Sequence, residues 1–203
     1  DYIVAADGGQ RHLEPLGVKA DLYLGDYDSS SKPETSVKTL VYPVEKDDTD
    51  TMLALKKGVA AGCKSFMILG GTGGRFDHTF ANIQALLSAP AAAGPLILPV
   101  LSVPAGALYT AGASAALADE GNFIFVLKND TAVIENNPGE KVSLFALDGA
   151  AHGITLEGFY YSLQNGTLYP FDPMGTSNYI TAPQGKVTVK KGTLLIVISK
   201  ENQ

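Results

Sequence analysis

The sequence predicts an α/β domain followed by an all-β domain, namely a Rossmann-like domain with a parallel sheet and then a C-terminal β-sandwich. Up to about residue 88, short apolar runs alternate with helical stretches, which is typical of a parallel sheet covered by helices. From about residue 122, short β-branched and aromatic segments are separated by frequent turn signals, as in a sandwich. We expect the two domains to span residues 1–118 and 119–203.

The N-terminal domain is predicted from four apolar runs that read as strands: "YIVAA", "DLYLG", "LVYPV" and "SFMIL". Two helices are predicted because apolar residues recur on one helix face, Met52, Leu55 and Val59 in the first and Phe80, Ile83 and Leu87 in the second. Gly62 is the expected C-cap of the first helix. We therefore expect the four strands to form one parallel sheet.

The stretch from Ser88 to Ala118 carries no charged residue and is long enough to be considered as a membrane span. Four prolines and three glycines within it would break a helix repeatedly. The sequence therefore favours an apolar, proline-rich linker at the end of the first domain, containing a strand at "LILPVLSV".

The C-terminal domain is predicted from strands such as "KVSLFAL", "KVTVK" and "TLLIVI" and from the turn signals around them. The signals are "KND", "NNPG", "DG", "NG" and "KKG" at residues 128–130, 136–139, 148–149, 165–166 and 190–192. Asn165-Gly166, between "FYYSL" and "TLYPF", predicts a hairpin with a two-residue turn.

Bulk composition excludes some classes of partner. The net charge of −6 and the pI near 5.0 argue against binding to nucleic acid or to an anionic membrane. A single cysteine, Cys63, excludes an internal disulfide and fits a reducing compartment, and we expect a cytoplasmic location. The chain starts at Asp1 without a methionine, which leaves open whether its N-terminus is complete.

Aspartates follow each of the four predicted strands at its carboxyl end, in "DGG", "GDYDS", "KDDTD" and "GGRFDH". In an open parallel sheet this edge is where ligands bind. Gathered carboxylates repel one another unless a cation is present, and Mg²⁺ is commonly shared between carboxylates and the phosphates of a substrate. The sequence therefore predicts a metal–phosphate site.

Glycines in the same loops would let backbone N–H groups approach phosphates, and two cations could neutralise them. The glycines are Gly8, Gly9, Gly25, Gly73 and Gly74, and the cations are Lys46 and Arg75. "GGTGGRFDH" fits neither the dinucleotide fingerprint nor the P-loop. The three histidines form no zinc site with the single cysteine, and we take His12 and His152 as structural.

A simpler interpretation is that the aspartates cap helices, since Asp28, Asp50 and Asp77 each precede a predicted helix. Capping leaves Asp26 and Asp47, the additional aspartates in two of these loops, without a role. The coincidence of four such loops favours the metal–phosphate site.

These motifs together resemble the thiamine pyrophosphokinase family. "DGG", "GDYDS", "KDDTD", "GGTGGRFDHTFAN" and "GTSN" occur in the order and approximate spacing of that family, over about residues 2–88 and 122–199. The resemblance implies transfer of the terminal diphosphate of ATP to the hydroxyl of thiamine, giving thiamine diphosphate and AMP. It also implies a homodimer, in which the first domain binds nucleotide and the second binds thiamine.

The resemblance also implies roles for individual residues. A magnesium-binding acidic cluster matches Asp7, Asp26, Asp28, Asp47 and Asp50. Asp28 and Asp50 are our candidates for the general base. The nucleotide side combines the residues of the glycine-rich motif with a nearby cation: Lys46, Gly73, Gly74, Arg75, Asp77 and His78. Ser177 and Asn178 resemble thiamine contacts that reach across the dimer.

Two other functions remain open from the sequence. In a metal-dependent glycosyltransferase, "DYD" at 26–28 would hold a nucleotide-sugar, but "KDDTD" and "GGRFDH" would have no role. A thiamine or nucleotide sensor that has lost turnover would not need the full set of aspartates.

Overall fold

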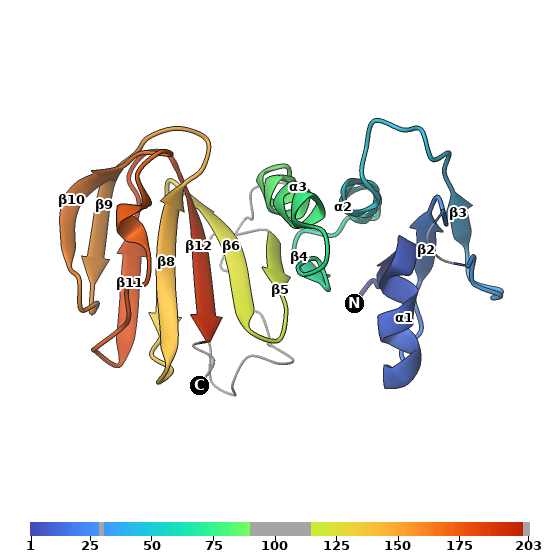
Figure 1. Cartoon of the computed structure of the whole chain (residues 1–203), viewed down its shortest axis with the longest axis horizontal. Helices are drawn as coiled ribbons and strands as arrows, with labels where there is room; N and C mark the ends of the chain where they lie inside the picture. Colours follow the sequence, from blue (N-terminus) through green and yellow to red (C-terminus); the bar gives the residue numbers. More distant parts are fainter. Residues whose placement is uncertain (29–30, 90–114, 201–203) are drawn as a thin grey trace.

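The structure, a computed structural model, describes residues 1–28, 31–89 and 115–200. An α/β part is followed along the chain by a β-rich part, and the two lie side by side (Figure 1). The predicted combination of an α/β part and a β-rich part is therefore confirmed.

The first three predicted strands form a small parallel sheet in the order β1-β2-β3. Its strands are β1 (Val4–Ala6), β2 (Leu22–Gly25) and β3 (Thr39–Val41). Between β1 and β2 lie the short helices η1 (Asp7–Gly9), α1 (Gln10–Leu13) and η2 (Glu14–Leu16). Buried apolar side chains from β1 and β2 fix this sheet, and its carboxyl ends carry the first two aspartate loops.

Helix α2 (Asp50–Ala60) forms where the apolar spacing predicts it. Its N-cap is Thr49, whose hydroxyl accepts a hydrogen bond of 3.2 Å from Met52 N, so Asp50 lies in the first turn and is not the cap. At the other end Gly62, at φ 87°, and Cys63 donate backbone hydrogen bonds to Val59 and Gly58. This is a Schellman motif, and it confirms the prediction that Gly62 terminates the helix.

The fourth predicted strand is not in the first sheet. Among the described residues, β4 (Phe66–Leu69) pairs in parallel with β5 (Ala115–Ala118), so the expectation of a single four-stranded parallel sheet is wrong. All four residues of β5 are buried, and each is in register with a residue of β4. The strand expected at "LILPVLSV" lies outside the described residues.

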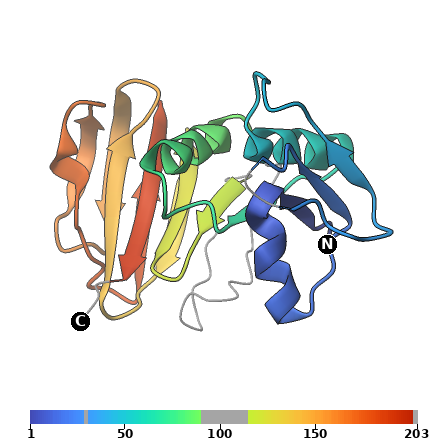
Figure 2. The ribbon, with the colours of Figure 1, turned by 45° about the vertical axis from the view of Figure 1, so that its right-hand side comes forward.

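Helix α3 (Phe76–Leu87) also forms as predicted, and Ile83 of the predicted face packs against the core, but the most buried residues lie beside that face. Ala85 and Leu86 are its buried residues, whereas Phe80 and Leu87 are 48% and 40% exposed. The helix packs on β5 and β6 (Figure 2), and contact with the small alanines of β5 selects the buried face.

The β-rich part consists of a five-stranded sheet, β4-β5-β6-β12-β8, and a four-stranded sheet, β10-β9-β11-β7. Apolar residues from both sheets form one buried cluster, so the two sheets share a core. The remaining elements are β6 (Asn122–Lys128), β7 (Thr131–Glu135), β8 (Glu140–Ala146), β9 (Ala151–Glu157), β10 (Leu163–Leu168), η3 (Pro173–Gly175), β11 (Gln184–Thr188) and β12 (Thr193–Lys200).

Four of the five predicted turns connect strands, but the hairpin turn at Asn165-Gly166 is wrong. Both residues lie within β10, where the register against β9 shifts. Asn165 has a φ of 50°, and its N–H donates to the Thr155 hydroxyl at 3.2 Å. Two residues that accept unusual backbone angles here produce an irregularity inside a strand instead of a turn.

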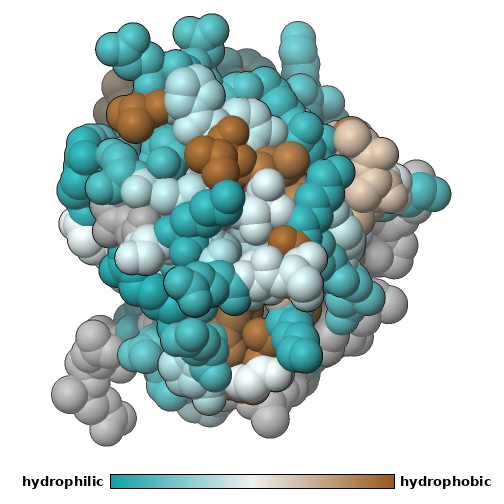
Figure 3. Space-filling view, turned by 90° about the vertical axis from the view of Figure 1, so that its right-hand side faces the viewer, coloured by the Kyte–Doolittle hydropathy of each residue, from teal (hydrophilic) through white to brown (hydrophobic). Residues whose placement is uncertain are grey.

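In the part of the chain that the structure describes, no helix is long and apolar enough to cross a bilayer. Viewed toward the β1–β3 end, the surface is mostly hydrophilic, and apolar side chains occur in small separate areas (Figure 3). This end of the molecule, where the aspartate loops lie, therefore presents a polar surface.

Candidate active site

The structure brings three of the predicted aspartates together. Asp7 directly follows β1, and Asp26 and Asp28 follow β2, and one carboxylate oxygen of each lies within 4.8 Å of those of the other two. The parallel pairing of β1 with β2 is the cause, because it places both carboxyl ends at one edge. Three oxygen donors at this spacing suit a hard divalent cation.

The backbone around these carboxylates adopts unusual angles. Asp7 and Tyr27 have φ values of 42° and 57°, which residues other than glycine rarely adopt. Gly25 lies so close to Asp7 that a Cβ on it would stand 3.0 Å from Asp7 Cα. A glycine is therefore needed for the two loops to meet, and strained residues of this kind are frequent at functional sites.

Lys46 lies between two aspartates. Its ammonium group donates a short hydrogen bond to Asp26, and Nζ lies 3.3 Å from Asp50 Oδ1. The three side chains are only 11–19% exposed. The hydrogen bond from Lys46 lowers the pKa of Asp26. Burial raises the pKa of Asp50 in spite of the nearby ammonium group. Lys46 therefore balances part of the negative charge of the site.

Tyr27 is a member of the site that the sequence reasoning missed. Its hydroxyl is buried and has no hydrogen-bond partner within the described ranges. Burial raises its pKa, and the charges of Asp7 and Asp50 raise it further. In the sequence, only the position of Tyr27 between two aspartates in "DYD" indicates that it belongs to the site. A buried hydroxyl without a partner, beside carboxylates, is available as a hydrogen-bond donor.

The "KDDTD" loop divides in the structure. Asp50 lies beside Lys46, whereas Asp48 forms an ion pair of 2.6 Å with Lys56 away from the three-carboxylate group. Asp47 is exposed and is not a member of that group. The structure thus associates Asp50 with the acidic group and leaves Asp47 at the surface.

The glycine-rich loop has an open end. Gly73 and Gly74 have φ values of 81° and 59°, and a Cβ on either would meet no atom within 4 Å. Their backbone is accessible to a ligand. At the base of the loop, a Cβ on Gly70 would lie 3.2 Å from His12 Nε2, so α1 contacts this loop directly. Because α1 follows Asp7, one short segment joins the acidic group to the glycine-rich loop.

Arg75, Asp77 and His78 lie exposed at the start of α3. Arg75 donates to Asp77 through Nη2 at 2.5 Å and Nε at 3.1 Å. This bidentate pair lowers the pKa of Asp77 and raises that of Arg75. Arg75, rather than a side-chain acceptor, occupies the N-cap position of the helix. An exposed guanidinium at the N-terminus of a helix can bind phosphate.

Ser177 and Asn178 lie beside exposed aromatic rings in the β-rich part. Ser177 is exposed, with a φ of 61°. Asn178 is buried, and its amide bonds the backbone of Tyr161 in both directions, at 3.1 and 2.8 Å. Tyr160 stacks on Tyr179 with ring centroids 4.8 Å apart. Asn178 therefore holds the tyrosine segment, whereas Ser177 is accessible; the aromatic "FYY" run was the missed signal.

Comparison with known proteins defines the class. The crystal structure of thiamine pyrophosphokinase from Bacillus subtilis has this fold, with a TM-score of 0.79 and 24% identity over 98% of this chain and 87% of that one. A family protein from Enterococcus faecalis matches at a TM-score of 0.76 with 26% identity over 100% and 90%. The Candida albicans enzyme shows the same fold at 16% identity and a TM-score of 0.71, over 99% and 82% of the two chains. The fold is that of a transferase of the kinase type.

The sequence comparisons identify the family. Residues 1–97 match the model of the thiamin pyrophosphokinase catalytic domain, and residues 131–194 match that of its vitamin B1 binding domain. The curated thiamine pyrophosphokinase of Bacillus subtilis (strain 168) is 26% identical over 98% of this chain and 87% of its own length. The chain therefore belongs to the thiamin pyrophosphokinase family, whose enzymes form thiamine diphosphate from thiamine, and the resemblance seen in its motifs is confirmed.

Proposed function

We propose that this enzyme transfers the terminal diphosphate of ATP to the hydroxyl of thiamine and releases AMP. The observation that carries the proposal is the three-carboxylate group of Asp7, Asp26 and Asp28, joined through α1 to an accessible glycine-rich loop. In such a transfer the protein mainly positions the substrates and stabilises the charge that develops on the phosphates.

The residues of the acidic group suit Mg²⁺, because they offer carboxylate oxygens that are close together and partly accessible. Asp7, Asp26 and Asp28 would hold the ion, with Asp50 close to them, and Asp47 would contribute from the exposed "KDDTD" loop. When bound, the ion would neutralise charge on the transferred phosphates. Lys46, which is already between Asp26 and Asp50, would be a protein cation close to those phosphates.

The nucleotide side is assigned to the glycine-rich loop and the start of α3. The open N–H groups of Gly73 and Gly74 would donate to phosphate oxygens. Arg75 would bind a phosphate through the guanidinium N–H groups that its bond to Asp77 leaves available. Asp77 would then orient the guanidinium, and His78 would remain at the exposed edge of the site.

Asp50 is the better candidate for the base that accepts the hydroxyl proton of thiamine. Burial raises its pKa, which makes it a stronger base than an ordinary carboxylate. Asp28, which is exposed and belongs to the three-carboxylate group, is the alternative.

The thiamine side is assigned to the region of Ser177 and the tyrosines. The exposed rings of Tyr160 and Tyr161 suit a flat cationic ring, and Ser177 can offer its hydroxyl. Within the proposal, the first domain (1–118) has a Rossmann-like nucleotide-binding role. The second (119–203), a β-sandwich, binds thiamine and forms the homodimer. The continuous β4-β5-β6 pairing joins the two. The cytoplasm is the proposed location.

The test is turnover of thiamine and ATP with Mg²⁺, compared with a chelator and with matched variants. Asp28→Asn should abolish turnover while leaving the thermal unfolding temperature nearly unchanged. Asp48→Asn, the control, removes a charge from a carboxylate that forms an ion pair with Lys56 and should keep near-normal turnover. Turnover that survives the chelator, or an Asp28→Asn variant as active as the control, would contradict the metal assignment.

A further inference from the structure

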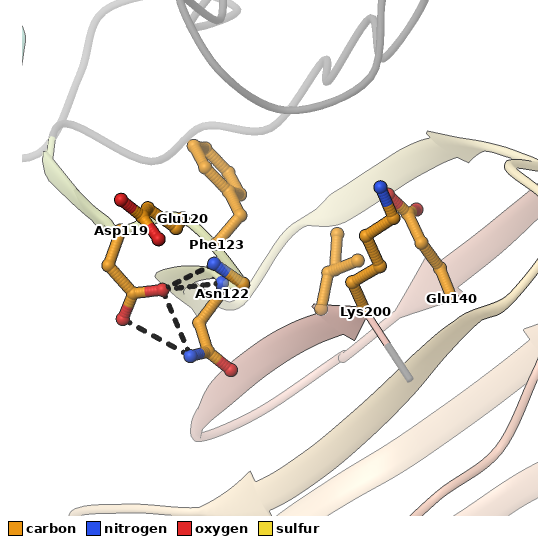
Figure 4. A pocket seen from close by; sticks show the side chains of 8 residues that line it. Asp119, Glu120, Asn122, Phe123, Glu140 and Lys200 are labelled. Atoms are coloured by element: carbon orange, nitrogen blue, oxygen red, sulfur yellow. Dashed lines mark hydrogen bonds between the residues drawn. The ribbon is translucent and has the colours of Figure 1, made fainter. Parts of the chain in front are cut away.

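The turn between β5 and β6 carries a carboxylate that reaches the glycine-rich loop. Asp119 accepts a short hydrogen bond from the Thr72 hydroxyl on one oxygen. Its other oxygen accepts from the backbone N–H of Gly121 at 2.8 Å and of Asn122 at 2.7 Å (Figure 4). Asn122 Nδ2 donates to both oxygens, at 3.0 and 3.1 Å. Hydrogen bonds within the β5–β6 turn therefore fix the Asp119 carboxylate, and its other oxygen accepts from Thr72 and holds that residue in place.

The rest of the loop base is also fixed. Asn82 Nδ2, on α3, donates to the carbonyl oxygen of Gly71 at 2.8 Å. A Cβ on Gly71 would stand 3.0 Å from Ile68 Cγ2 and 3.1 Å from Leu117 Cδ1, so the backbone is packed closely there. Thr72, whose hydroxyl bonds to Asp119, directly precedes the open pair Gly73-Gly74. The Asp119–Thr72 bond therefore lies at the boundary between the fixed base and the open end.

We propose that Asp119 is a positioning residue for nucleotide binding, acting through Thr72 on the backbone of Gly73 and Gly74. The inference rests on the proposed role of this loop in holding the phosphates of ATP. Glycines lose more conformational freedom on ordering than other residues, and a loop that is ordered before binding loses less when the ligand arrives. Fixing Thr72 supplies this order from the β-rich part of the chain, 47 residues further on.

The selective test is Thr72→Val, which removes the hydroxyl but keeps the shape of the side chain and leaves the Asp119 turn intact. Thr72→Ser retains the hydroxyl and is the rescue variant. Thr131→Val is the matched control, because the Thr131 hydroxyl bonds to the Thr188 hydroxyl, at 3.0 Å, in the β7–β11 pair, outside the proposed nucleotide site. The KM values for ATP and thiamine, kcat and the unfolding temperature are measured for these three variants, for Asp119→Ala, and for the double variant of Thr72→Val with Asp119→Ala.

Thr72→Val is expected to raise the KM for ATP about ten-fold, with the KM for thiamine within about two-fold of the wild type and an unfolding temperature like that of the control. Thr72→Ser should restore the KM for ATP. In the double variant with Asp119→Ala, the KM for ATP should equal that of Asp119→Ala alone, because both changes remove the same bond between Asp119 and Thr72.

A Thr72→Val variant with the wild-type KM for ATP would overturn the inference, as would an equal rise in both KM values. Failure of Thr72→Ser to restore ATP binding would overturn it as well. Absence of turnover in the wild-type protein would instead contradict the proposed function. In that case, direct binding of ATP–Mg²⁺ to the same variants still tests the role of Asp119.

Discussion

Replacement of Lys46 by methionine tests how the acidic site is stabilised. The methionine keeps most of the length of the side chain but removes the ammonium group that lies between Asp26 and Asp50. Two carboxylates that are 11% and 19% exposed would then lack their counter-ion. We expect the variant to be less stable at neutral pH and to bind ATP more weakly.

The size of the effect follows from the geometry. At the 3.3 Å between Lys46 Nζ and Asp50 Oδ1, an effective dielectric constant of about 20 gives an attraction of about 5 kcal/mol. Desolvation of the three groups offsets part of it, so the expected loss is about 2–3 kcal/mol in the free energy of unfolding. Lys56→Met is the matched control, because Lys56 and Asp48 are 58% and 30% exposed and such pairs contribute less than about 1 kcal/mol.

The assay is urea unfolding of both variants and the wild type at several pH values. Asp26 has a lowered pKa in the folded protein. Its bond to Lys46 therefore stabilises the fold fully above the unfolded-state pKa of about 3.9, and this stabilisation is lost as the pH falls through the lower folded-state pKa. The stability difference between wild type and Lys46→Met should accordingly be constant near neutrality and shrink in acid. A Lys46→Met variant as stable as Lys56→Met at pH 7 would refute the reasoning.

Three further predictions concern the phosphate loop, the β-rich core and the thiamine side. Arg75→Ala should raise the KM for ATP about ten-fold or more. The urea midpoint should not fall, because Arg75 is 74% exposed. An unchanged KM for ATP would show that Arg75 does not bind the nucleotide. Gly158→Ala should cost more than about 3 kcal/mol in urea unfolding, since φ is +80° and a Cβ would lie 2.3 Å from the Gln184 oxygen. Gly139→Ala, at φ +85° in open space, should cost only about 1 kcal/mol, and equal losses would contradict the packing argument. Tyr160→Ala should raise the KM for thiamine about five-fold and leave that for ATP unchanged; a rise for ATP alone would place the tyrosines elsewhere.

Features governed by local chemistry could be predicted from the sequence. Gly62 ends α2 in a Schellman motif, and the meeting of Asp7 with Asp26 and Asp28 follows from a parallel β1–β2 pair. In both cases a few neighbouring residues, or one common edge of a sheet, determine the geometry. The order of the motifs along the chain also gave a resemblance to the correct family.

Features governed by contacts between residues far apart in the sequence could not be predicted. The spacing of "SFMIL" predicts a strand but not that it pairs with β5, because any neighbouring strand could satisfy its backbone. Lys46 was expected to face phosphate, and only the three-dimensional arrangement shows it between Asp26 and Asp50. No local pattern relates Thr72 to Asp119, since 47 residues separate them.

The central claim is transfer of a diphosphate in one step, and isotope-labelled ATP tests it most directly. The protein is incubated with thiamine, Mg²⁺ and ATP labelled either at the α- or at the γ-phosphate, and the products are separated by chromatography. We expect one AMP for each thiamine diphosphate, with the α-label in AMP and the γ-label in thiamine diphosphate. ADP together with thiamine monophosphate would show transfer of a single phosphate and would contradict the account.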